Sequence, residues 1–223
     1  MRVTEIFAFV AFPYLCLAFF AVGHAYRYVT DRFAWNAHSS EFIEKKNLMW
    51  GSYLFHLGIL GTLAGHAGGL LIPQRLFDLV GINGEAHTAL AYFSGMGVGL
   101  MTWIGALLLL WRRLTNRRVR RMTTAADWVV IVSLVVVSGL GTFNVFFGHF
   151  YVLDTIAPWI RGIVTLQPDP RLMAAVPWGY KIHILAALLL LAFSPFSRLV
   201  HIWSAPIFYL FRRPLVFRRQ VVA

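Results

Sequence analysis

The sequence is short of charged residues, and this shortage argues against the commonest classes of protein. Only 13% of its 223 residues are charged, whereas soluble domains average about 25%. Apolar residues make up 59% of the chain, and its mean hydropathy is +0.67. A soluble domain of this size has no means of burying so much apolar surface. The composition therefore argues against a soluble globular fold and against a disordered chain.

Cysteine is nearly absent as well, because Cys16 is the only one. A single thiol cannot form a disulfide within the chain, and no C-x-x-C-H motif is present for covalent attachment of a c-type haem. An iron–sulfur cluster held by this chain alone is excluded, since it needs several cysteines. The sequence also lacks a dinucleotide-binding fingerprint and a P-loop, which argues against nucleotide binding by those routes.

Long stretches of the chain carry no charge, although the net charge is +11. The lysines and arginines stand in short blocks between these stretches, a pattern typical of membrane loops rather than of a nucleic-acid-binding groove. We therefore expect membrane lipids around the chain and no nucleic-acid partner. The uncharged stretches are residues 6–26, 47–74, 86–111, 128–153 and 182–197.

These stretches predict five transmembrane helices, because a spanning helix needs about 20 apolar residues. The fifth stretch is short, so we expect its helix to bend at Pro195 and continue past Arg198, whose long side chain can reach the membrane surface. Thr124-x-x-Asp127 predicts the start of the fourth helix. The predicted fold is an all-α integral membrane protein with a single membrane domain, 1–223. Its helices are expected at residues 5–26, 47–72, 86–111, 124–148 and 178–203, followed by a cytoplasmic tail at 204–223.

The distribution of basic residues predicts the orientation of these helices. Five of the 20 lysines and arginines lie before the first helix, between the second and third, or between the fourth and fifth, and the other segments hold the remaining 15. The positive-inside rule then places the amino terminus outside and the carboxy terminus in the cytoplasm. The densest basic block, 112–121, belongs to an inner loop. The longest outer connection, 149–177, is proline-rich and is expected to be an interfacial segment.

Four of the eight histidines lie within two of the predicted spans: His56 and His66 in the second, and His183 and His201 in the fifth. Polar residues at membrane depth are costly, so each needs a partner or a function. The second helix runs outward and the fifth inward, which places His66 level with His183 outside and His56 level with His201 inside. One such histidine is as well explained by a hydrogen bond to a neighbouring helix, but four in two helices favour a shared function.

Each histidine pair predicts a b-type haem. Neutral imidazole is a good iron ligand, and two axial imidazoles leave the iron six-coordinate, which suits electron transfer. The spacings match imperfectly, because ten residues rise about 15 Å and eighteen about 27 Å along an ideal helix. We expect helix tilt, haem tilt and a bend at Pro195 to absorb the difference. His24, at the inner end of the first helix, is the reserve ligand.

Small and basic residues near these histidines have two interpretations each. Gly65, like other glycines of the second and third helices, permits either close approach of a flat porphyrin or plain helix packing. Arg112, Arg113 and Arg198 lie at the inner surface. They either pair with haem propionates or set the topology and contact lipid headgroups.

Two blocks of this sequence resemble a known family. Residues 54–66 read LFHLGILGTLAGH, and residues 193–206 read FSPFSRLVHIWSAP. Together with residues 37–40 (AHSS), they resemble the gamma subunit of the membrane-bound respiratory nitrate reductase. That subunit is a five-helix dihaem cytochrome b of the prokaryotic cytoplasmic (inner) membrane. The similarity covers nearly the whole chain, and the outer loop between the fourth and fifth helices departs most from it.

The resemblance implies a complete electron route. Menaquinol or ubiquinol is oxidised near the outer haem, and electrons pass to the inner haem and then to the iron–sulfur beta subunit. The molybdenum alpha subunit finally reduces nitrate to nitrite in the cytoplasm. The resemblance also implies the same ligand pairs, His66 with His183 for the outer haem and His56 with His201 for the inner haem.

For quinol, the family uses a basic residue at the outer start of the third helix, and here His87 occupies about that place. His87 is expected to hydrogen-bond a quinol oxygen and accept its proton. Glu85 is expected to relay the proton outward, and Gly65 to leave room for the quinol ring. The plainer alternative is that His87 is an ordinary interfacial histidine.

Two other functions stay open at this point. The chain is alternatively the cytochrome b subunit of a formate dehydrogenase or hydrogenase, although residues 193–206 argue against it. A function of another class is a small proton-coupled transporter whose buried histidines relay protons.

Overall fold

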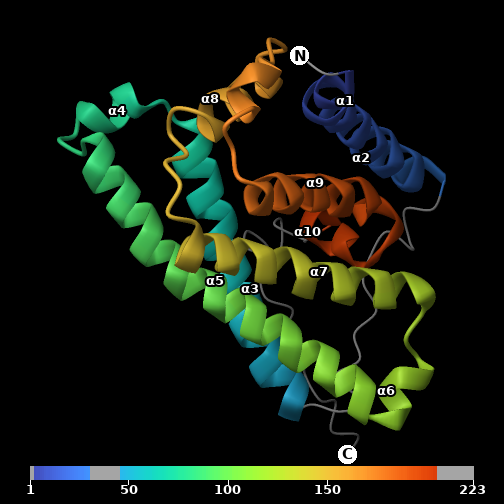
Figure 1. Cartoon of the computed structure of the whole chain (residues 1–223). Coiled ribbons are helices and arrows are strands. Elements are labelled where there is room, and N and C mark those ends of the chain that lie inside the picture. Colours follow the sequence, from blue (N-terminus) through green and yellow to red (C-terminus); the bar gives the residue numbers. More distant parts are fainter. Residues whose placement is uncertain (1–2, 31–45, 205–223) are drawn as a thin grey trace, which may run out of the picture.

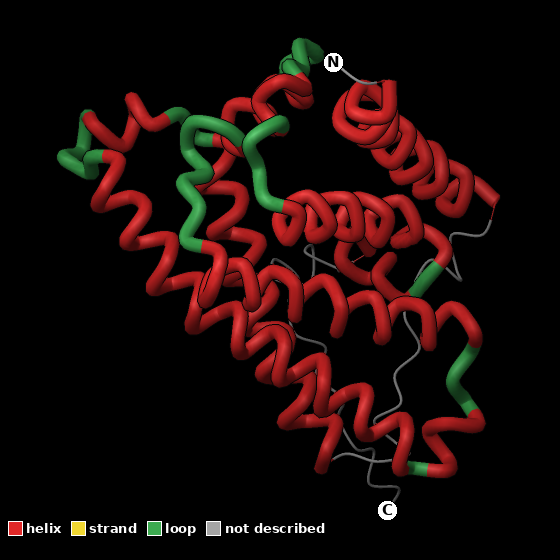
Figure 2. The backbone as a smooth tube through the Cα atoms, viewed as in Figure 1, coloured by secondary structure: helices red, strands yellow, loops and turns green. Residues whose placement is uncertain are grey.

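The computed structural model describes residues 3–30 and 46–204, and within these ranges every regular element is a helix (Figures 1 and 2). Five helices are long and apolar enough to cross a membrane, as predicted. They are Val3–Thr30, Leu48–Leu71, Gly84–Thr115, Ala125–Gly148 and Trp178–Phe196. The predicted tail and residues 37–40 lie outside the described residues.

The first three spans are built from these elements: α1 (Val3–Ile6), the π-helical turn η1 (Phe7–Ala11), α2 (Phe12–Thr30), α3 (Lys46–His66), the π-helical turn η2 (Ala67–Leu71) and α5 (Gly84–Thr115). The last two spans consist of α7 (Ala125–Phe143), the π-helical turn η3 (Asn144–Gly148) and α9 (Trp178–Phe193). Short helices lie in the connections: α4 (Gln74–Asp78), α6 (Arg117–Arg121), α8 (Ile156–Val164) and the 3₁₀ turn η4 (Pro170–Met173).

Side-chain caps fix where two of the spanning helices begin. Thr124 and Asp127 form a reciprocal capping box at the start of α7, which confirms the predicted start signal. Asn83 caps α5 by accepting a hydrogen bond from the backbone N–H of Ala86 at 2.9 Å. Such caps satisfy backbone donors that have no partner within the helix.

The spans pack in a row rather than around a common axis. α3 lies along α5, α5 against α7, α7 against α9, and α9 against α2, so α9 lies between α2 and α7 (Figure 1). Glycines allow the closest of these contacts. A Cβ on Gly58 would lie 2.4 Å from the backbone nitrogen of Thr102, and one on Gly105 would lie 2.4 Å from that of Phe55. Among the described helices, α3 does not pack closely against α9.

The connection between α7 and α9 is a packed segment. α8 buries its apolar face, including Trp159, against Phe9 and Met173. α8 and α4 lie at the end of the bundle where the chain begins, and α6 lies at the opposite end (Figure 1).

Each π-helical turn has a backbone carbonyl that accepts a hydrogen bond from a side chain outside its own helix. Trp159 Nε1 donates to Phe9 O at 2.9 Å, Arg161 Nη1 to Leu70 O at 3.1 Å, and the Tyr180 hydroxyl to Asn144 O at 3.1 Å. The i→i+5 geometry of a π turn disturbs the regular α-helical bonding around it. These three donors therefore stabilise irregular helix ends.

The fifth helix differs from the prediction of a single kinked helix over 178–203. α9 ends at Phe193, and the 3₁₀ turns η5 (Ser194–Phe196) and η6 (Arg198–Val200) follow before the short α10 (His201–Ser204). Pro195 has no N–H to donate, and Ser197 adopts extended backbone angles, so the chain breaks where a bend was expected. This break explains the spacing mismatch, because His183 and His201 do not share one continuous helix.

Candidate functional site: two histidine pairs

The structure brings the four predicted histidines together in the two predicted pairs. The ring centres of His66 and His183 are 6.2 Å apart, with ring planes inclined by 30°. Those of His56 and His201 are 6.0 Å apart, with planes inclined by 63°. The predicted proximity is therefore confirmed, while the role of these residues as haem ligands stays a prediction.

All four rings are held in the same way, by a hydrogen bond from Nδ1 to a backbone carbonyl. The acceptors for His56 and His66 are the carbonyls of Ser52 and Thr62, one turn earlier on α3, both at 2.7 Å. His183 bonds the carbonyl of Val137 on α7 at 3.0 Å, and His201 bonds that of Arg198 at 2.5 Å.

This bonding pattern determines the tautomer of each ring. A carbonyl oxygen can only accept, so Nδ1 carries the proton in a neutral imidazole and Nε2 keeps its lone pair. A metal-binding histidine needs this arrangement, in which one ring nitrogen is fixed by a hydrogen bond and the other is the ligand. Four rings in the ligand tautomer fit a metal centre better than they fit histidines that merely join helices.

The distance between the rings also fits a shared metal ion. Metal–imidazole bonds are about 2 Å long and the ring centre lies about 1 Å behind its nitrogen, so two axial imidazoles have centres about 6 Å apart. Both pairs have this separation. A direct hydrogen bond between two rings would instead bring their nitrogen atoms to about 3 Å, and so their ring centres to about 5 Å. The donor set fits the predicted iron of a b haem.

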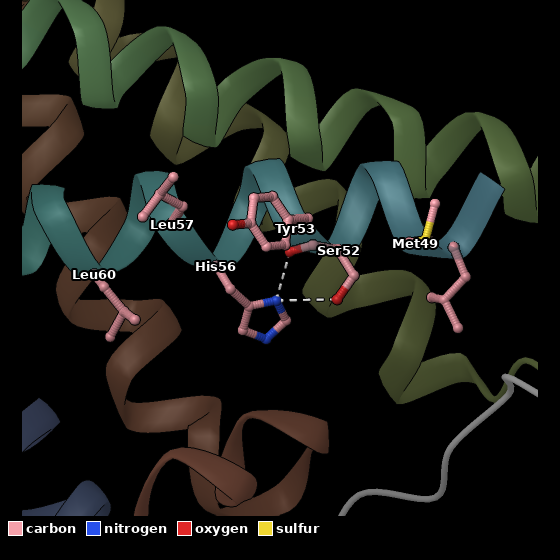
Figure 3. A pocket seen from close by; sticks show the side chains of 7 residues that line it. Met49, Ser52, Tyr53, His56, Leu57 and Leu60 are labelled. Carbon is pink, nitrogen blue, oxygen red and sulfur yellow. Dashed lines mark hydrogen bonds between the residues drawn. The ribbon is translucent and has the colours of Figure 1, made fainter. Parts of the chain in front are cut away.

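The surroundings of the inner pair leave space beside α3. His56 lies on the side of α3 that faces away from α5 (Figure 3). It lines an open hollow of about 460 Å³ whose lining residues all belong to α3. Its other lining residues are Leu48, Met49, Ser52, Tyr53, Leu57 and Leu60. In the protein alone both histidines of α3 are exposed, which is costly at membrane depth unless a bound group covers them.

The glycines divide between the two interpretations that the sequence left open. Gly58 and Gly61 pack α3 against α5, since a Cβ on Gly61 would lie 2.6 Å from Val98. Around Gly65 and Gly68, in contrast, no atom lies within 4 Å of a built Cβ. These two glycines next to the outer pair therefore leave room for a flat ring.

An ion pair that was not among the predictions, with its carboxylate buried, lies beside the inner pair. Arg198 donates to both carboxylate oxygens of Asp127, from Nε to Oδ1 and from Nη2 to Oδ2 at 3.1 Å. The Asp127 side chain is only 4% exposed. The signal was present in the sequence, since Asp127 and Arg198 lie at the inner ends of adjacent helices, but Asp127 was interpreted only as a cap.

The other predicted propionate-binding arginines lie close to this ion pair. Arg112 is buried on α5. Arg113 donates from Nη1 to the hydroxyl of Thr123 at 3.2 Å, and it interacts electrostatically with Asp127, Arg198 and Arg112. The end of the bundle that holds His56 and His201 thus gathers positive charge, while the propionate-binding role of these arginines stays a prediction.

His87 is buried at the outer start of α5, where its ring lies against α4. Its Nδ1 bonds Gln74 Oε1 at 2.7 Å, and its ring lies 4.1 Å from that of Phe77. Gln74 Nε2 donates to Asp78 Oδ1 and to Ile82 O, both at 2.9 Å. These two acceptors fix the orientation of the amide, so Gln74 presents its oxygen to His87.

The roles of His87 and Glu85 in quinol oxidation stay predictions, and the structure shows only what surrounds each side chain. His87 Nδ1 must be the donor to Gln74, which leaves Nε2 as an acceptor, and Nε2 faces Gly69, 3.5 Å from a Cβ built there. Glu85 is exposed at the same helix end. Residues two apart on a helix point to different sides, so the bonded partner of His87 is Gln74 rather than Glu85.

Comparisons with known proteins identify the family. The family model described as nitrate reductase gamma subunit matches residues 5–220. The nitrate reductase gamma chain of Bacillus subtilis is 38% identical over 212 residues, covering 93% of this chain and 95% of that protein. The respiratory nitrate reductase 1 gamma chain of Escherichia coli is 33% identical over 218 residues, covering 96% of each chain. The nitrate reductase-like protein NarX of Mycobacterium tuberculosis is 39% identical over 214 residues, which are 33% of its length.

Proposed function

The chain belongs to the nitrate reductase gamma subunit family, and on that premise we propose that it is a dihaem cytochrome b that oxidises quinol. It would pass the electrons through two b haems to an iron–sulfur beta subunit and a molybdenum alpha subunit. The alpha subunit would reduce nitrate to nitrite. The cell compartment proposed is the cytoplasmic (inner) membrane of a prokaryote, with the amino terminus outside and the carboxy terminus in the cytoplasm.

The observation that carries this proposal is the shared form of the two histidine pairs. In each pair two ring centres lie about 6 Å apart, and every Nδ1 donates to a backbone carbonyl. His66 and His183 would hold the outer haem, and His56 and His201 the inner one. These four histidines would hold the haems, and a haem held in this way would supply one-electron transfer.

The charged inner end suits the carboxylates of the inner haem. Arg112 and Arg198 are proposed to face its propionates, because arginine binds carboxylates through paired N–H donors. Asp127 already occupies two donors of Arg198. The Arg198 side chain is 29% exposed.

At the outer end, the residues of this chain bind quinol and remove its protons. Oxidation of a quinol to a quinone releases two electrons and two protons. His87 Nε2 is an acceptor and is proposed to take a proton from a quinol hydroxyl, as a general base. Gly65 and Gly68 leave space for the ring, and Glu85, exposed nearby, is the proposed next proton acceptor on the way outside.

This arrangement separates charge without a proton channel. Protons leave near the outer face, while the electrons cross to the inner face. There they meet the protons consumed when nitrate is reduced to nitrite and water. Charge then moves across the membrane by electron transfer alone. The arginine-rich segment α6 at the inner end faces partner subunits or anionic lipid in this scheme.

The decisive test is haem content and its response to nitrate. Membranes that contain the chain with its partner subunits should show b-type bands in a reduced-minus-oxidised spectrum. The purified chain should yield two haems b in a pyridine haemochrome assay. Quinol should reduce these haems and nitrate should reoxidise them. A chain without haem would favour the transporter alternative, and haems that formate or hydrogen reduces would favour the formate dehydrogenase or hydrogenase alternative.

A further inference from the structure

The inner ligand His201 lies after the break in the fifth span, outside any long helix. It is the first residue of α10, a helix of only four residues, and follows the 3₁₀ turns η5 and η6. The other three ligands lie on α3 and α9, where the helix itself sets the direction of the side chain. Something other than a long helix must therefore set the position of His201.

Arg198 links His201 to the start of α7. The carbonyl of Arg198 accepts the hydrogen bond from His201 Nδ1 at 2.5 Å. The side chain of the same residue binds both oxygens of Asp127. The carboxylate thus fixes the residue whose backbone fixes the ligand ring.

Asp127 is a firm anchor for this link. It lies in the first turn of α7, where one of its oxygens also accepts from the backbone N–H of Thr124 at 3.0 Å. The side chain is nearly completely buried, and Val130 and Ile131 on the next turn are buried as well. Removing this carboxylate would take away the group that Arg198 Nε, Arg198 Nη2 and the Thr124 N–H all bind.

We propose that Asp127 is a positioning residue for the inner haem: through Arg198 it holds His201 in the orientation that the iron needs. This inference rests on the proposed function, since it assumes that His56 and His201 are haem ligands. Groups that hold a metal ligand in place typically change metal affinity 10- to 100-fold when they are removed.

The segment that follows α9, residues 194–204, has a second anchor on its other side. A Cβ on Gly23 of α2 would lie 2.9 Å from the Pro195 side chain, and the Trp203 ring packs 5.3 Å from that of Phe20. These contacts hold the ends of the segment, residues 194–196 and 203. The Asp127–Arg198 pair holds its middle, next to the ligand. Loss of Asp127 is therefore expected to release the ligand without detaching the segment.

The test is Asp127→Asn in the chain assembled with its partner subunits in membranes. Asparagine keeps the size of the side chain and an oxygen for the Thr124 N–H, but it removes the charge that pairs with Arg198. We expect the haem content to fall from two towards one per chain. The remaining spectrum and redox titration should match those of His201→Ala, which lacks the inner ligand, with the outer haem retained.

Two matched variants separate positioning from general stability. Asp169→Asn makes the same change in an exposed ion pair, Asp169 with Arg171 at 3.2 Å, and should keep both haems. Thr124→Ala removes the hydroxyl of the capping box but leaves the Asp127 carboxylate, and should keep both haems too. The outer haem reports within each molecule that the bundle is folded.

Two results would overturn the inference. The first is an Asp127→Asn variant with two haems and an unchanged inner-haem potential. The second is a parallel loss of both haems, which would make Asp127 a residue of the fold alone. A wild-type chain without b haems would overturn the proposed function itself, and this inference with it.

Discussion

The outer and inner histidine pairs have nearly the same ring separation but are built differently. The outer rings come from His66, the last residue of α3, and from His183 in the long helix α9, and they are inclined by 30°. The inner ring of His56 also comes from α3, but His201 follows a broken segment, and its ring is inclined by 63° to that of His56. In the outer pair, both rings are positioned by long helices. In the inner pair, one ring is positioned by a long helix and the other by an ion pair.

This difference teaches where each site is sensitive to change. A ligand on a long helix is positioned by many backbone hydrogen bonds, so few single substitutions nearby displace it. A ligand after a break depends on a few side-chain contacts. We therefore expect changes around the inner pair to act through side-chain contacts such as Asp127–Arg198, and changes around the outer pair to act mainly by direct steric conflict.

The largest expected effects come from the ligands themselves. Replacing any of the four histidines by alanine should remove one haem and lower quinol:nitrate activity at least about 100-fold. The two pairs should then differ. In His201→Ala, quinol should still reduce the outer haem but nitrate should not reoxidise it, whereas in His66→Ala quinol should reduce neither. Stopped-flow spectra of the b bands distinguish these cases, and identical behaviour would contradict the assigned order of the haems.

His87→Ala should act at the outer end without touching either haem. The variant loses the Nε2 acceptor, so quinol oxidation should slow by about 100-fold, the usual range for loss of a general base. Both haem spectra should be unchanged, and haems reduced by dithionite should be reoxidised by nitrate at the normal rate. Loss of a haem in this variant would instead mean that a ligand has been misassigned.

Gly141→Ala tests whether the outer pair fails by steric conflict. A Cβ on Gly141 would lie 2.9 Å from Cε1 of His183, so the ring or α7 must shift, at a cost of about 1–3 kcal/mol. Outer-haem occupancy should fall, by about 10-fold in affinity, while the inner haem stays. Gly95→Ala is the matched control, because its Cβ would meet Val145 at an ordinary 3.6 Å. Equal haem loss in both variants would contradict this explanation.

The smallest effect is expected from Gln74→Leu, which removes the acceptor of the His87 Nδ1–H. A buried donor without a partner costs about 1–3 kcal/mol, and the ring can then adopt the other tautomer, so quinol oxidation should slow several-fold. In a His87→Ala background Gln74→Leu should have no further effect, because the two residues act as one unit. Additive losses would show that Gln74 acts independently.

The sequence predicted the parts of this molecule that depend on simple periodic rules. Apolar stretches of about 20 residues predicted five spans, and Thr124-x-x-Asp127 predicted the start of α7. The antiparallel order of the second and fifth spans predicted which histidines meet. These predictions succeeded because the length of a span and the antiparallel order of successive spans follow from the pattern of apolar stretches.

The missed features depend on contacts between distant segments. Pro195 was expected to bend a helix, whereas the chain changes into 3₁₀ turns whose position is fixed by Gly23 on one side and Asp127 on the other. The hydrogen bond between Gln74 and His87 joins residues on both sides of a turn, and no periodic pattern indicates it. The sequence could not show which glycines of α3 pack against α5 and which leave room for a ring, because it does not show which face of α3 meets α5.

The three π turns have a consequence for exchanging parts between related proteins. Two of their carbonyls accept hydrogen bonds from Trp159 and Arg161 of α8, in the connection between α7 and α9. The loop and the helix ends beneath it are therefore joined, because each supplies the hydrogen-bond partners of the other. A chimaera that imports another protein's loop must import the matching helix ends as well, or the carbonyls of Phe9 and Leu70 lose their donors.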